Sequence, residues 1–197
     1  GGPLNQGLNA LQARFNLAGS DWEWGSYFAD AMIARGDFQN GVLTILPLRF
    51  RTGEGEIALA GSFGAEAISG QLEITELPIR GRINASVALA GTEVNPQAQG
   101  TIQIADAELN ETPVYTAAGG FNYNNAVLRF AGNSTLAEGG TPLTLSGRIP
   151  YRLPLPQAQP PDSYDFNLVA RAQDDGLAIL NFFTNRYLTW QVGQGEA

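Results

Sequence analysis

Apolar and polar residues alternate along much of this chain. In residues 143–149 the odd positions hold Leu, Leu, Gly and Ile, and the even positions hold Thr, Ser and Arg. A period of two is typical of a β-strand with one dry face and one wet face. The same alternation predicts strands in earlier stretches, at residues 56–63, 70–77, 79–89 and 100–107. The pattern therefore predicts an all-β protein.

Turn-forming residues separate these stretches. Asn-Gly at 40–41 is typical of a two-residue hairpin turn, and NYNNA at 122–126 indicates another turn before a strand. Gly-Gly at 139–140 provides a flexible connection. Residues 27–34 fit either a helical turn or a strand, and we favour a strand because the segments that follow pair naturally as hairpins. The sequence thus predicts an antiparallel-rich sheet.

The remaining stretches complete this outline. Residues 8–17 and 22–24 are predicted as two short strands, and residues 42–50 as a longer one in which Pro47 indicates an edge or a bulge. The proline-rich stretch 153–161 is predicted to be a loop that crosses an edge of the sheet. A further strand is expected at 164–172.

Internal similarity indicates a repeating build. DFQNGVL at 37–43 matches NYNNAVL at 122–128, and each match is followed by a Gly-rich turn and a strand that ends in Gly. We therefore divide the chain into a β-repeat segment at 1–78 and a second segment, continuous with it, at 79–172.

The hydrophobic period changes after residue 172. Leu177, Leu180 and Phe183 recur at helical spacing behind two carboxylates, which favour a helix N-terminus. A short amphipathic helix is predicted at 173–190, with these three side chains covering the groove of the sheet. Residues 191–197 are expected to begin a further strand.

Composition limits the function classes. The net charge is -8, and all eleven basic residues are Arg; a phosphate-binding surface needs clustered cations, so no nucleic-acid partner is expected. The pairs Arg49/Arg51 and Arg80/Arg82 are interpreted as solvated or edge-protecting charges. The sequence has no His and no Cys, which removes the usual general base and the commonest metal ligand.

Acidic pairs remain as candidates for catalysis. They occur at Asp21/Glu23, Glu54/Glu56, Asp106/Glu108 and Asp174/Asp175. A glycosidase needs two carboxylates facing each other across a cleft, but the spacing selects no pair, and Asp174/Asp175 lacks a calcium-binding pattern. We therefore expect no enzyme activity, no metal and no cofactor. Trp22 and Trp24 could stack on sugars, but we favour packing in the core or at its rim as their role.

The feature that remains is collective. Strand after strand places apolar side chains on one face, which is core in a closed barrel or sandwich and a continuous groove in an open sheet that curls on itself. A soluble protein rarely exposes an apolar patch beyond a few hundred Å² without using it. We predict that the following residues line a shared groove: Ile57, Leu59, Leu72, Ile74, Ile83, Val87, Leu89, Ile102, Ile104, Leu143, Leu145, Phe166 and Leu168.

Four motifs in a linked order resemble the C-terminal repeat region of the TamB family, large envelope proteins grouped with AsmA-like bridge proteins. They are GTEVNPQAQGTIQIADAEL, NETPVYTAAGGFNYNNAVLRF, GGTPLTLSGRIPYRLP and DDGLAILNFFTNRYLTWQVGQGEA. The resemblance covers residues 79–197 well and the first 78 more loosely. The Asn/Gln-rich composition without Lys resembles cyanobacterial-type members.

The resemblance implies a fold, a function and a location. The fold is an elongated, curled "β-taco" whose groove shields phospholipid acyl chains during transport between the inner and outer membranes, in support of outer-membrane biogenesis. The location is the periplasm, in a parent anchored in the inner membrane. The resemblance also implies a partner for parts of the parent outside this chain, an outer-membrane barrel of the BamA-like superfamily.

Three hypotheses therefore stand side by side. The first is the lipid conduit, which needs no catalytic residue. The second is a structural or chaperone-like scaffold for outer-membrane protein assembly or translocation, in which the groove or an edge receives a β-strand. The third is a secreted β-solenoid that binds or degrades glycans. At one strand for every ten to fourteen residues, the outline predicts about 14 to 18 strands stacked over roughly 65 to 85 Å.

Overall fold

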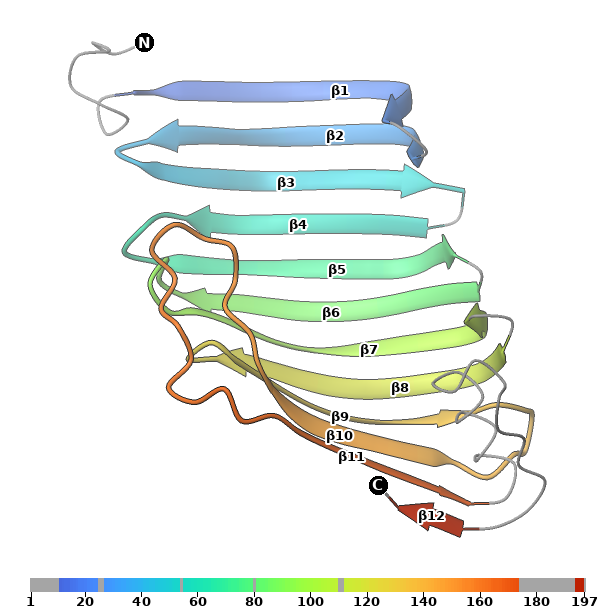
Figure 1. Cartoon of the computed structure of the whole chain (residues 1–197). Helices are drawn as coiled ribbons and strands as arrows, with labels where there is room; N and C mark the ends of the chain where they lie inside the picture. Colours follow the sequence, from blue (N-terminus) through green and yellow to red (C-terminus); the bar gives the residue numbers. More distant parts are fainter. Residues whose placement is uncertain are drawn as a thin grey trace.

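The chain forms a single antiparallel sheet. The computed structural model describes residues 11–24, 27–53, 55–79, 81–109, 112–173 and 194–196. Twelve strands follow one another across the sheet in sequence order, so that each pairs with the strand before it and the strand after it (Figure 1). The prediction of an all-β, antiparallel fold is confirmed.

The strands have the following bounds: β1 Ala13–Trp24, β2 Tyr27–Gln39, β3 Val42–Thr52, β4 Gly55–Phe63, β5 Ile68–Ile79, β6 Gly81–Gly91, β7 Pro96–Leu109, β8 Thr112–Asn124, β9 Val127–Thr135, β10 Leu143–Pro150, β11 Asn167–Gln173 and β12 Gln194–Glu196. Residues 27–34 belong to a strand, as predicted. The stretch 22–24 is not a separate strand, because β1 runs through it without a turn. The described strands are fewer and longer than the outline predicted, because neighbouring strands stay paired up to their turns.

Helix is absent from the described residues. The helix predicted at 173–190, with Leu177, Leu180 and Phe183, lies outside them except for Gln173, which ends β11. Accordingly, no helix in this part of the chain has the length and the apolar character that a membrane span requires.

The predicted turns lie where the sequence indicated. Asn40 and Gly41 both have positive φ, 52° and 76°, which is the backbone of the hairpin turn that matches the twist of the flanking strands. Asn125 and Ala126 repeat this arrangement between β8 and β9. Pro47 lies within a register shift between Ile45 and Leu48 of β3. It marks a bulge, and β3 is an interior strand rather than an edge.

The registers place apolar residues on one face of the sheet from β1 to β11. Two adjacent cross-strand rows define this apolar face. The first row is Gly19, Met32, Phe50, Ile57, Ile74, Ala85, Ile102, Gly119, Gly132, Leu145 and Ala170. The second row is Leu17, Ala34, Leu48, Leu59, Leu72, Val87, Gly100, Phe121, Phe130, Gly147 and Leu168.

The opposite face is mostly polar or lined by small residues, and Ile33 and Val169 are the exceptions in its central row. The row between the two apolar rows shows this, and it consists of Ala18, Ile33, Arg49, Ala58, Glu73, Ser86, Thr101, Gly120, Ala131, Ser146 and Val169. We call this side the polar face. The two faces are thus not exchanged from β1 to β11, although bulges in β3 and β5 interrupt the period of two.

The sheet is a single open layer. It does not curl into the predicted β-taco, and its first and last strands do not meet (Figure 1). The chain exposes 12828 Å² of surface, whereas a compact monomer of 21.0 kDa exposes about 9,000 Å². No large side chain of the described residues is fully buried. Alternation determines which face is apolar but carries no information about curvature, which is why the predicted curl and the described sheet differ.

A strap without regular structure, residues 151–166, connects β10 to β11 and passes along the ends of several strands (Figure 1). The hydroxyl of Tyr123 donates to the Tyr151 carbonyl oxygen at 3.0 Å, and the Gln159 amide donates to the Val94 carbonyl oxygen at 2.8 Å. Tyr123 shares its register with Ala98 and Leu128 and therefore lies on the apolar face. The prediction of a loop at 153–161 is confirmed, and this loop is fastened to the turns that follow β6 and β8.

Candidate functional site

The apolar face holds most of the residues that the sequence predicted for a groove. Ile57, Ile74, Ile102 and Leu145 lie in its first row, and Leu59, Leu72, Val87 and Leu168 lie in its second. Ile83, Ile104 and Leu143 belong to a third row beside the first, and Leu89 pairs with Gly70 and Ala98 on the same face. Twelve of the thirteen residues thus share one surface, and their role with lipid stays a prediction.

Phe166 is the exception. β11 begins at Asn167, three residues later than predicted, so Phe166 belongs to the strap and is 73% exposed. It lies next to the apolar face rather than inside one of its rows.

Several residues of the same face escaped the sequence analysis. Phe50, Phe121 and Phe130 lie in its two rows, together with Met32 and Leu17. The alternation at 121, 123, 128 and 130 could have identified two of the aromatic residues. The assignment of Leu17 and Met32 to this face depends on the pairing of β1 with β2. The prediction of a separate short strand at 22–24 obscured that pairing.

Phenylalanine rings lie over glycines on this face. Phe130 pairs with Gly147, where an added Cβ would lie 2.8 Å from the ring carbon Cζ. Phe15 pairs with Gly36 in the same way, and there the corresponding distance is 2.6 Å. Each ring fills the space that a side chain would need, so the face stays smooth and apolar atoms cover the backbone of the glycine.

Arginines of the two pairs singled out in the sequence form ion pairs with carboxylates on the polar face. The Glu56 carboxylate accepts a hydrogen bond from Arg51 Nε at 2.8 Å and lies 3.9 Å from Arg49 Nε. Arg82 contacts Asp106 at 2.7 Å and approaches Glu76 at 3.9 Å. These guanidinium groups are satisfied by carboxylates of neighbouring strands, so they do not form a cluster of cations for phosphate. Arg80 lies outside the described residues.

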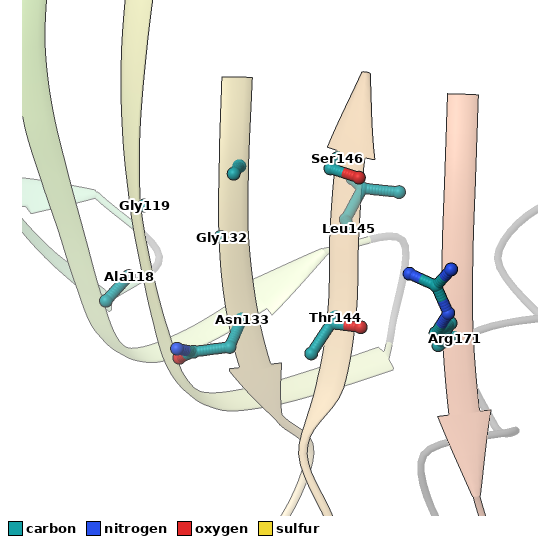
Figure 2. Close-up of a pocket in the computed structure, with 9 residues that line it drawn as sticks. Ala118, Gly119, Gly132, Asn133, Thr144, Leu145, Ser146 and Arg171 are labelled. Carbon is teal, nitrogen blue, oxygen red and sulfur yellow. The ribbon is translucent and has the colours of Figure 1, made fainter. Parts of the chain in front are cut away.

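A shallow hollow of about 530 Å³ lies over β8 to β11. Figure 2 shows Ala118, Asn133, Thr144 and Arg171 around it, and register pairing places these four in one row of the polar face. Hydroxyl, amide and guanidinium groups line it, together with Ala, Gly and Leu145, and its lining has no carboxylate. Such a hollow offers hydrogen bonds to a ligand but no acid–base pair.

The acidic pairs do not gather into a facing arrangement among the described residues. Asp106 is engaged by Arg82, and Glu56 by Arg51. Glu54 and the pair Asp174/Asp175 lie outside the described residues. No group of three or more carboxylates in the described part of the chain is arranged to hold a metal ion.

Comparison of the chain with protein-family models, with curated proteins and with solved structures finds no match in any of the three. The apolar face is therefore the candidate functional site on its geometry alone, since two rows without a polar side chain cross it from β1 to β11.

Proposed function

We propose that this chain is a non-enzymatic segment of a bridge between membranes, whose apolar face shields phospholipid acyl chains in transit. The observation that carries the proposal is the pair of apolar rows that cross β1 to β11 without a polar side chain. Eleven strands at about 4.8 Å spacing make a strip roughly 50 Å long. Each CH₂ that the strip keeps from water contributes about 0.8 kcal/mol.

The uniformity of the strip favours a passage over a fixed pocket. No polar group of the two rows would hold a head group at one position, so an acyl chain gains nearly the same free energy at every strand. A ligand that binds equally well along a path meets no deep minimum on it. Such a surface suits the movement of mixed lipids.

The curled β-taco belongs to this proposal as a second conformation. The described sheet is open, and we propose that it bends around acyl chains when they occupy the apolar face. Bending reduces the water-exposed apolar area, so bound lipid and curvature stabilise each other.

The proposal extends to location and partners. We propose a periplasmic location, in a parent anchored in the inner membrane that meets an outer-membrane barrel of the BamA-like superfamily through parts outside this chain. The support is the ordered series of motifs that resembles the TamB family.

Photo-crosslinking in cells tests the proposal. A photoreactive residue replaces Leu145, which lies on the apolar face, or its neighbour Thr144, which lies on the polar face. We expect lipid adducts at position 145 and few at position 144, because only the first side chain faces the acyl path. Equal labelling at both positions would contradict the conduit.

A scaffold for outer-membrane proteins is the second candidate. Among the described residues β1 pairs only with β2, which leaves one side of a twelve-residue strand free for strand addition. Under this function the same crosslinking experiment gives protein adducts rather than lipid adducts at position 145.

A further inference from the structure

One corner of the sheet exposes a group of large apolar side chains, where β10 ends and β11 begins. Tyr164 and Phe166 are 75% and 73% exposed, the two highest values among the large apolar side chains that the structure describes. Leu168 follows them in β11, Ile149 lies at the end of β10, Tyr151 directly follows that strand, and all three are also exposed. We call these five residues the aromatic corner, and we infer that it docks on the surface of a lipid bilayer.

The corner is built from the ends of two adjacent strands. Arg148 of β10 and Asn167 of β11 are register partners, and the Arg148 guanidinium donates to the Asp165 carbonyl oxygen. Tyr151 directly follows β10, and Phe166 directly precedes β11 (Figure 1). Tyr151 and Phe166 therefore flank neighbouring strand ends, and Tyr164 precedes Phe166 by two residues.

The backbone at the corner is held in position. The amide of Tyr151 donates to the Ala126 carbonyl oxygen at 2.8 Å, and its own carbonyl oxygen accepts from the Tyr123 hydroxyl. Ordering these residues therefore costs little when they bind a surface. Exposed aromatic side chains on a fixed backbone form a binding surface that is already organised.

The chemistry of the corner favours lipid over a peptide strand. Tyrosine combines an apolar ring with a polar hydroxyl and is enriched where membranes meet water. Proline has no amide hydrogen to donate to an added strand. The end of β10 and the strap contain five prolines: Pro150, Pro154, Pro156, Pro160 and Pro161. A strand partner would lose hydrogen bonds along this segment, whereas an interfacial lipid layer requires none.

The charges of the corner indicate which bilayer it fits. Arg148 and Arg152 are balanced by Asp162 and Asp165, and the whole chain carries a net charge of -8. The negatively charged chain as a whole is repelled by an anionic membrane surface. The corner has no net positive charge that would attract such a surface. The corner therefore fits a zwitterionic phospholipid surface.

The inference deepens the proposed function and rests on it in one respect. Leu168 lies in the second row of the apolar face, and Ile149 pairs with Leu128 on that face. Acyl chains that leave a docked bilayer at the corner would reach the apolar face directly. The corner thus supplies the place at which lipid enters or leaves the sheet.

Vesicle flotation of the full chain tests the docking. With phosphatidylcholine vesicles we expect the unaltered chain to float, Phe166→Ser to weaken partitioning about tenfold, and Tyr164→Ser/Phe166→Ser to weaken it further, because each ring removes apolar area from the contact. Leu46→Ser is the matched control, since Leu46 is 58% exposed at the bulge of β3 and lies away from the corner. Adding phosphatidylglycerol to the vesicles should reduce binding.

Three outcomes would overturn the inference. In the first, the unaltered chain does not float with the vesicles. In the second, Phe166→Ser and Leu46→Ser lose vesicle binding to the same extent. In the third, the chain associates with itself, and Phe166→Ser loses this association rather than vesicle binding. Lipid crosslinking at position 145, measured on the same proteins, separates the two proposals. Lipid adducts without flotation would contradict docking by the aromatic corner and support the lipid conduit. Flotation without lipid adducts would support docking and contradict the conduit.

Discussion

At the scale of single residues, the smoothness of the apolar face depends on glycine. A ring that lies over a glycine covers backbone that would otherwise be exposed, and it removes part of its own apolar area from water. Both effects stabilise the sheet. Phe130 over Gly147 and Phe15 over Gly36 are two instances on different strand pairs. The same sites are intolerant of a larger residue, because the ring and a backbone oxygen already occupy the space.

Gly147→Ala should therefore destabilise the sheet. Its Cβ would lie 2.8 Å from both the Phe130 ring and the Asn167 carbonyl oxygen, and relieving such overlap costs about 1–3 kcal/mol of the free energy of unfolding. Equilibrium urea unfolding measures the loss.

Gly120→Ala is the control within the same sheet. The nearest atom to its Cβ is the Gly100 carbonyl oxygen at 3.5 Å, an ordinary contact. Alanine restricts the unfolded chain, so we expect this variant to be unchanged or more stable by about 0.5 kcal/mol. Equal destabilisation of the two variants would show that the ring contact at Gly147 is not the cause.

At the scale of elements, the strap is fastened by polar contacts rather than by pairing in the sheet. Gln159 donates to Val94 and Asn125, and the Asn125 amide donates to the side chain of Asn95, which binds the turns after β6 and β8 to each other and to the strap. Tyr123 adds the contact closest to β10, with only 6% of its surface exposed. The strap is thus a separate element that depends on a few side chains.

Tyr123→Phe should loosen the strap and leave the strands intact. The hydroxyl donates to the Tyr151 carbonyl oxygen and accepts from the Leu153 amide at 3.4 Å. Its removal leaves part-buried polar groups without a partner, at a cost of about 1–3 kcal/mol. Trypsin cleavage after Arg152 should then become about tenfold faster or more.

Tyr115→Phe serves as the control, because Tyr115 is an exposed tyrosine of the same strand β8. It should leave trypsin cleavage after Arg152 unchanged, with the β-sheet circular dichroism signal preserved in both variants. Unchanged cleavage in Tyr123→Phe would mean that the other contacts alone hold the strap.

At the scale of the whole molecule, each strand depends on its immediate neighbours. The strands follow sequence order across the sheet, and none of the described strands forms a second layer over either face. Stability in such a chain is close to a sum of neighbour terms, so the ends open more easily than the centre.

Amide hydrogen exchange should report this gradient. Backbone amides of β5, β6 and β7 should exchange slowest, because these strands lie at the centre of the sheet, farthest from both ends. In β1 we expect alternate amides to exchange fast, since every second amide points away from β2. Uniformly slow exchange along β1 would contradict the free edge that the scaffold hypothesis needs.

Most of the fold was predictable because its information is local. Alternation identified strands within 56–107 and at 143–149, and Asn-Gly at 40–41 and NYNNA at 122–126 identified two of the turns. Strand boundaries were less accurate: β1 absorbed residues 22–24, and β11 began after Phe166. Boundaries depend on pairing with neighbours, which no single stretch of sequence contains.

The sequence by itself determined that the protein is a sheet with one apolar face, because the period of two assigns every side chain to a face before any strand pairs. Only the tertiary structure decided that twelve strands pair strictly in order, that the sheet stays open, and that Tyr151 and Phe166 flank the paired ends of β10 and β11. These properties depend on contacts between residues distant in the chain and on the curvature of the backbone. Alternation is unchanged by either, so the sequence pattern does not encode them.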